Sequence, residues 1–136
     1  MSLLGRFAGQ QRGAVAVEFA LLAPVLVMFL ASLADISRLM YAGMNVHNAA
    51  RDGARAYAVY DPNWQTEASQ ALPSGTGYTA GSPTSSCGSP PPGTCASGNP
   101  VTVTVPLTVT IDMPVMQQIL GGSSITISGT ATMEIT

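Results

Sequence analysis

Residues 12–34 read RGAVAVEFALLAPVLVMFLASLA, and this stretch decides how the rest of the chain is arranged. From Ala14 to Ala34 the single charged residue is Glu18. A helix of this length rises about 31 Å, which matches the roughly 30 Å hydrocarbon core of a bilayer. Residues 14–34 are therefore predicted to form a transmembrane helix, and residues 1–13 are predicted to precede it as a leader peptide.

The position of Glu18 allows three interpretations. A charged side chain at the centre of such a helix costs about 2.5 to 3.5 kcal/mol on insertion scales, and less toward the ends. In the first interpretation Glu18 reaches the interface and the segment is a simple anchor. In the second, the segment is a secretory signal that is cut after Ala34, where Ser32 and Ala34 give the small-x-small pattern. In the third, cleavage between Gly13 and Ala14 creates an α-amino group that neutralises Glu18 of a neighbouring subunit.

Three motifs carry a resemblance to a known family. They are RGAVAVEFALLAP at 12–24, NAARDGARA at 48–56 and GTATME at 129–134. In these motifs the chain resembles the tight-adherence (TadE-like) minor pilin family. The resemblance implies a processing site at Gly13 and Ala14, and a role in subunit assembly for Glu18 and Phe19. The related major pilins carry tyrosine at the position of Phe19, so this chain keeps the ring and lacks the hydroxyl.

The resemblance implies a structural subunit, a minor pilin or pseudopilin, of a tight-adherence type IV-like pilus assembly system. Its implied partners are other pilin subunits, a prepilin peptidase, the inner-membrane assembly machinery and the lipid bilayer. The alternative is a single-span, membrane-anchored adhesin or sensor domain that does not assemble into a filament. That alternative predicts an intact N-terminus and a Glu18 that tolerates replacement by leucine.

Charge argues for the topology and against nucleic acid as a partner. The chain has no lysine, and beyond the leader three arginines face seven acidic residues. Nucleic-acid binding needs clustered basic side chains, so we expect none. Arg6 and Arg12 precede the apolar segment without any acidic residue. The positive-inside rule therefore places the N-terminus in the cytoplasm and the C-terminus outside the bacterial inner membrane, with the cell surface or a pilus as a further location.

Cys87 and Cys95 are the two cysteines of the chain, and they lie in a segment rich in proline and glycine. In an oxidising compartment we expect them to form a disulfide that staples this loop; two free thiols are the alternative. A zinc site would need two further ligands, and no histidine or acidic residue is nearby, so no metal is expected. The remaining titratable side chains are scattered, and we expect no catalytic site, no cofactor and no small-molecule substrate.

The helix is predicted to continue beyond the membrane to Tyr60, because polar residues recur at helical spacing between Asp35 and Arg55. Two i,i+3 ion pairs are expected, Asp35 with Arg38 and Asp52 with Arg55. Residues of the opposite, apolar side are expected to cover a small domain: Ile36, Leu39, Met40, Gly43, Met44, Ala50, Ala54 and Tyr57. The small residues Gly43, Ala49, Ala50, Gly53 and Ala54 suit either the chain's own sheet or a neighbouring subunit.

Residues 61–136 are predicted to form a small extracytoplasmic domain. Asp61 is expected to cap a short helix that has Trp64, Ala68 and Leu72 on one face. Residues 73–100, of which 22 are Gly, Pro, Ser or Thr, predict an extended loop. Alternation over 101–112 and 125–135 predicts two strands, with Pro106 placing the first at an edge or breaking it, and 114–120 predicts a short helix. The fold class is α+β, with the long N-terminal helix packed against a small antiparallel β-sheet.

Overall fold

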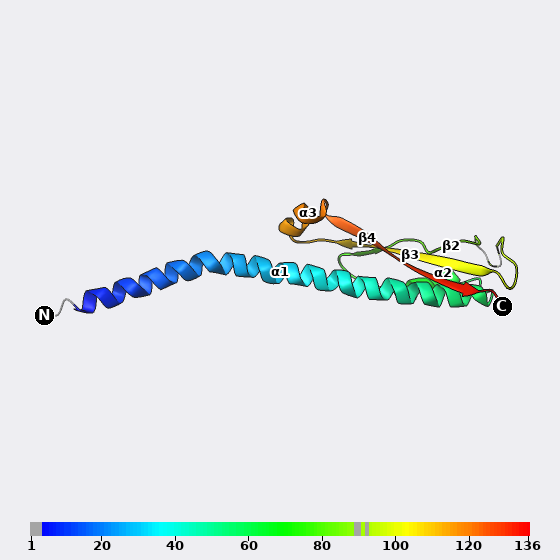
Figure 1. Cartoon of the computed structure of the whole chain (residues 1–136), viewed down its shortest axis with the longest axis horizontal. Coiled ribbons are helices and arrows are strands. Elements are labelled where there is room, and N and C mark those ends of the chain that lie inside the picture. The colour runs from blue at the N-terminus through cyan, green and yellow to red at the C-terminus, as the bar shows by residue number, and fades with distance from the viewer. Residues whose placement is uncertain (1–3, 89–90, 92) are drawn as a thin grey trace. The chain divides into compact units, whose positions relative to one another are not determined.

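The computed structural model describes residues 4–88, 91 and 93–136, and the side chains among them from Gly13 onward. The chain divides into two compact units, Met1–Ala34 and Asp35–Thr136, and the first helix contributes to both. The elements in chain order are α1 (Leu4–Ala58), α2 (Trp64–Gln70), β1 (Tyr78–Ala80), β2 (Thr84–Ser85), β3 (Pro100–Thr110), α3 (Pro114–Leu120) and β4 (Ser124–Glu134). The chain is coloured along this order in Figure 1.

Helix α1 begins ten residues before the predicted start at Ala14. No proline lies between Leu4 and Gly13, so every residue of this segment can donate a helical backbone hydrogen bond. The helix is also continuous through Pro24, where one backbone donor is missing. Its predicted end at Tyr60 is close to the observed end at Ala58.

The C-terminus of α1 is closed by a Schellman motif that uses tyrosine where glycine is usual. The amide of Asp61 donates to the carbonyl of Ala56, and the amide of Tyr60 donates to the carbonyl of Tyr57, both at 3.0 Å. Tyr60 has φ +62°. This left-handed conformation costs an L-residue roughly 1–2 kcal/mol relative to glycine. The turn therefore ends the helix with a strained backbone at Tyr60.

Strand β3 is the centre of the antiparallel sheet. Along one side it pairs with β4 over eleven consecutive residue pairs, from Pro100 with Glu134 to Thr110 with Ser124. Along its other side it pairs with β1 near one end and with β2 near the other. Both short strands lie within 73–100, which was predicted to be loop throughout. That segment cannot fold alone, but the free side of β3 supplies backbone partners for it.

The prediction that Pro106 marks an edge strand or a break is wrong for β3, and the hydrogen bonds show why. The carbonyl of Pro106 accepts the amide of Gly81 at 3.0 Å, so the backbone polar groups of Pro106 point away from β4. On that side the segment 81–83 interrupts the pairing between β1 and β2. The missing N–H therefore faces a gap in the neighbouring strands, and the ladder to β4 stays complete.

The core lies between the sheet and the part of α1 that follows Asp35. The inward side chains of β3 are all buried: Val101, Val103, Val105, Leu107 and Val109. They meet small residues of α1, chiefly Ala42, Val46, Ala49, Ala50, Gly53 and Ala54. Of the small residues whose partner was left open, Ala49, Ala50, Gly53 and Ala54 are buried within their own domain, while Gly43 has open space around it.

The predicted apolar face of α1 is confirmed at Tyr57, which is buried, and at Leu39, which packs against the core, but it is wrong at three other bulky positions. Ile36, Met40 and Met44 are exposed, whereas Asp35, which was placed on the polar face, is buried. The reason is how closely the backbones approach. A Cβ on Gly129 of β4 would lie 2.3 Å from the carbonyl oxygen of Val46, so the strand touches the helix backbone. Only small side chains of α1 fit beneath such a strand, and the long ones point outward.

Two short helices complete the domain. In α2 the predicted inward face is confirmed, since Trp64, Ala68 and Leu72 are buried. The N-cap is Asn63 rather than Asp61, whose carboxylate instead accepts the Asn63 amide at 2.8 Å. Helix α3 occupies the predicted residues and ends at Gly121 in the left-handed conformation, φ +76°. The structure confirms the α+β fold with the long helix against a small antiparallel sheet.

Candidate functional site

The first unit is a helix whose apolar side chains are exposed. Every large apolar residue between Val15 and Leu30 is exposed, for example Phe19 at 69% and Leu26 at 57%. Among the described residues, this helix is long and apolar enough to cross a membrane, judged by length and composition. The Ser32 hydroxyl has its hydrogen-bond partner within the helix, because it donates to the carbonyl of Met28 at 2.9 Å. Such a surface requires an apolar environment from outside the chain.

The residues predicted for processing and assembly lie on this helix. Gly13 and Ala14 are inside α1, and no atom lies within 4 Å of a Cβ built on Gly13. Ala14 and Glu18 are one turn apart, so they share a face of the helix. Glu18 and Phe19 are both exposed within the unit. An amino terminus at Ala14 and the carboxylate of Glu18 would thus lie on the same face of the helix, one turn apart.

The comparisons with known proteins bear on this segment. Residues 13–55 match the TadE-like protein family. No curated protein and no solved structure was found to match the chain. The TadE-like match covers about a third of the 136 residues and begins at Gly13, the last residue of the predicted leader.

The TadE-like match spans both halves of α1. It includes the first motif from Gly13 and the second motif as far as Arg55. The third motif, at 129–134, lies outside it and belongs to β4. The matched segment joins the exposed apolar helix to the close-packed small residues that hold the sheet.

A polar junction fixes the start of the second unit. Asp35 is only 5% exposed, and its Oδ2 accepts the amide of Met113 at 3.2 Å. Arg38 forms an ion pair with Asp112, not with Asp35 as predicted. The hydrogen bond to Asp112 and the charge of that carboxylate raise the pKa of the Arg38 guanidinium above its ordinary value. Both contacts join α1 to the connection between β3 and α3.

Local sequence patterns did not predict these long-range partners. Asp35 and Asp112 stand 77 positions apart, and the i,i+3 spacing of Asp35 and Arg38 favoured a local pair instead. A hint was present in Asp112 itself, which follows a strand and precedes Pro114. A carboxylate at such a strand-to-helix connection is well placed to receive an arginine from another element.

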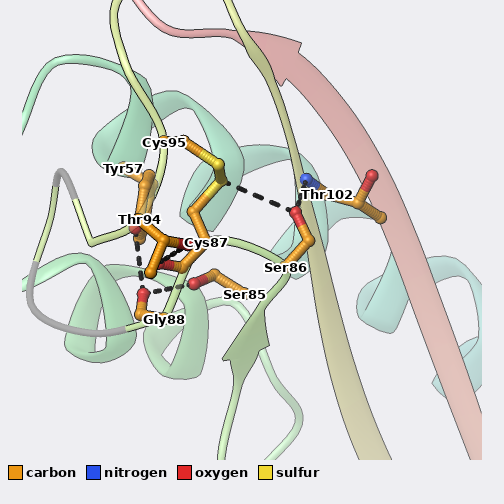
Figure 2. The surroundings of a disulfide bond; sticks show 8 residues. All are labelled: Tyr57, Ser85, Ser86, Cys87, Gly88, Thr94, Cys95 and Thr102. Carbon is orange, nitrogen blue, oxygen red and sulfur yellow. Dashed lines mark hydrogen bonds between the residues drawn. A yellow bond between two sulfur atoms is a disulfide. The ribbon is translucent and has the colours of Figure 1, made fainter.

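Cys87 and Cys95 are joined by a disulfide, with their Cα atoms 5.3 Å apart. Figure 2 shows how the surrounding hydrogen bonds hold this loop. Tyr57 of α1 donates its hydroxyl to the carbonyl of Gly88 at 2.9 Å, and the amide of Thr94 donates to the carbonyl of Cys87 at 2.7 Å. Position 93 requires glycine, because a Cβ there would lie 1.8 Å from the Cys87 carbonyl oxygen. The loop is thereby attached to the end of α1.

The rest of the described surface includes a depression that charged side chains line. A shallow depression between the end of α1 and α2 is lined by Asp52, Arg55, Asp61 and Glu67, among others. Within the described part of the chain, no group of three or more His, Cys, Asp or Glu side chains is arranged to hold a metal ion. Trp64, on the inward face of α2, is a core residue that packs edge-on against Tyr57 with ring centroids 5.3 Å apart.

Proposed function

We propose that this protein is a structural subunit of a tight-adherence, type IV-like pilus assembly system, a minor pilin or pseudopilin. One observation carries the proposal: the segment that matches the TadE-like family contains an exposed apolar helix with a single acidic residue near its start. A plain anchor needs no carboxylate at this position, since an acid lowers the free energy gained on insertion.

In this proposal the helix has two environments in turn. The apolar segment first holds the subunit in the bacterial inner membrane, with the second unit outside the cytoplasm. A prepilin peptidase then cuts between Gly13 and Ala14, which removes Arg6 and Arg12 and frees the α-amino group of Ala14. On assembly the apolar surface moves from lipid to the helices of neighbouring subunits, so its burial is maintained throughout.

Glu18 sets the register of that assembly. Once the helix is buried among other helices, an unpaired carboxylate is costly, and an amine from a neighbouring subunit relieves the cost. Breaking such a pair by removing one partner costs about 3–5 kcal/mol. Subunits shifted along the helix axis would leave both charges without partners, so only one register is favourable.

The proposal is tested by replacing Glu18 with leucine. Insertion into the membrane should be unchanged or improved, because a charge is removed from the apolar segment. Incorporation into the pilus-type assembly should fall at least tenfold, because the neighbouring amine loses its partner. Membrane fractionation and pull-down of partner subunits measure the two properties on the same cells.

Glu67→Leu is the matched control, because Glu67 is an exposed acid of α2 in the second unit. It should leave both membrane insertion and assembly at the wild-type level. If Glu18→Leu assembles as well as Glu67→Leu does, the assembly role is wrong, and the chain is a tethered extracytoplasmic domain.

A further inference from the structure

Helix α3 exposes apolar side chains that the fold does not use. None of its seven residues is buried, and Val115, Ile119 and Leu120 are exposed, Ile119 at 71%. Val115 and Ile119 lie one turn apart on one face of the helix. From Met113 to Met133 the chain has no charged residue. A surface helix on a water-soluble domain would instead carry polar residues on its outer face.

The N-terminus of α3 is fixed to the first turn of the second unit. The amide of Met113 donates to buried Asp35, and Asp112 pairs with Arg38. The side-chain amide of Gln117 donates to the carbonyl of Ile111 at 2.7 Å, which turns Gln117 inward, while Gln118 is exposed beside Ile119. In Figure 1 α3 lies at the end of the sheet opposite the C-terminus. Its apolar face is thus held in place beside Asp35 and Arg38.

These attachments set the depth of α3 if the apolar segment spans a bilayer. Asp35 follows directly after Ala34, the last residue of that segment. At 1.5 Å per residue, Asp35 and Arg38 lie about 2 to 6 Å beyond its end along the helix axis. The headgroup region on each side of the hydrocarbon core is about 5 to 7 Å thick. The attachment points of α3 therefore fall within the headgroup region.

We propose that α3 is a second membrane contact, which places Val115, Ile119 and Leu120 in the headgroup region of the bilayer that holds α1. The proposal rests on the membrane-anchored state described above. A lipid surface is the occupant that fits, because the face is apolar, uncharged and attached next to the end of the apolar segment. The contact would restrict rotation and tilt of the extracytoplasmic unit relative to the membrane before assembly.

Bromine quenching of a single added tryptophan tests this contact. The full-length variant Ile119→Trp is reconstituted into phosphatidylcholine–phosphatidylglycerol vesicles with and without brominated acyl chains. Val59→Trp is the matched control, because Val59 is also an exposed aliphatic residue and lies directly after the C-terminal end of α1. The native Trp64 is buried and gives the background, measured on the unaltered chain.

We expect brominated lipid to lower the Ile119→Trp emission about twofold after background subtraction, and to leave the Val59→Trp emission unchanged. Equal quenching of the two variants would overturn the proposal. A blue-shifted Ile119→Trp emission without bromine quenching would also overturn it, because the residue would then be packed against protein.

Flotation of the same vesicles separates this proposal from the proposed function. Variants that float without specific quenching at position 119 overturn the α3 contact and leave the α1 anchor intact. Variants that do not float overturn the anchor itself, and the contact with it. Flotation together with specific quenching supports both.

Discussion

The two halves of α1 both carry apolar side chains, but these side chains have opposite surroundings. Before Ala34 the apolar side chains are large and exposed; after Asp35 the residues that face the sheet are small and buried. The large side chains of the first half can pack against a partner outside the chain. The small side chains of the second half let strand β4 contact the helix backbone at Gly129. Side-chain size therefore helps to distinguish the part of this helix that packs against its own chain from the part that needs an outside partner.

The largest expected effect comes from filling the contact between β4 and α1. Gly129→Val should lower the free energy of unfolding of the second unit by about 3 kcal/mol or more, because its Cβ would overlap the Val46 carbonyl. Urea unfolding followed by Trp64 fluorescence measures this. Membrane insertion should be unchanged, since the first half of α1 is untouched.

Gly43→Ala is the control for that substitution, because nothing lies within 4 Å of a Cβ at position 43. It should raise stability by about 0.5–1 kcal/mol, as alanine does in place of glycine inside a helix. If Gly129→Val were as stable as Gly43→Ala, the close approach of strand and helix would be wrong.

An arginine introduced into each half of α1 should affect membrane insertion in the first half only. Leu26→Arg in the first half should cost about 3 kcal/mol of insertion free energy and reduce the membrane-bound fraction, while the second unit still folds. Met44→Arg, at a position 63% exposed in the second half, should leave both properties unchanged. Fractionation of membranes measures insertion; equal retention of both variants would contradict the assignment of residues 14–34 to the bilayer.

Reduction of the disulfide should act on the second unit alone. Closing so short a loop stabilises a fold by about 2 kcal/mol in the chain-entropy account. Dithiothreitol, or the Cys87→Ser/Cys95→Ser double variant, should lower the free energy of unfolding by that amount in the same urea measurement. A change in membrane retention on reduction would show that the two halves are not independent.

The smallest effect is expected at the end of α1. Tyr60→Gly should stabilise the second unit by about 1 kcal/mol, because glycine adopts the left-handed conformation at Tyr60 without strain. The urea midpoint should rise with an unchanged slope. A lower midpoint would mean that the Tyr60 side chain contributes more through its contacts than its backbone costs.

Periodicity predicted the long helix, both long strands, α2 and α3, because each pattern depends on residues close together in sequence. It placed Ile36, Met40 and Met44 inward, because hydrophobicity alone does not report how much room a facing strand leaves. The sequence also predicted β3 as an edge strand, because Pro106 lacks a backbone donor. Which neighbouring strand that missing donor faces depends on the register of β3 with β1 and β2, which no local pattern reports.

At the candidate site, the sequence named Gly13, Ala14, Glu18 and Phe19 through local motifs, and the TadE-like match covers all four. It missed the attachment of α3 to Asp35 and Arg38, which depends on contacts between residues more than 70 positions apart. Such contacts follow from the packing of the sheet on α1, and no local pattern encodes them.

In the proposed function, the first half of α1 is a processed assembly helix rather than a permanent anchor. Mass spectrometry of the native protein extracted from membranes measures this directly by mapping its N-terminus. We expect a chain that begins at Ala14, with residues 1–13 removed. A native chain that still carries residues 1–13 would contradict the proposed function and leave a tethered extracytoplasmic domain.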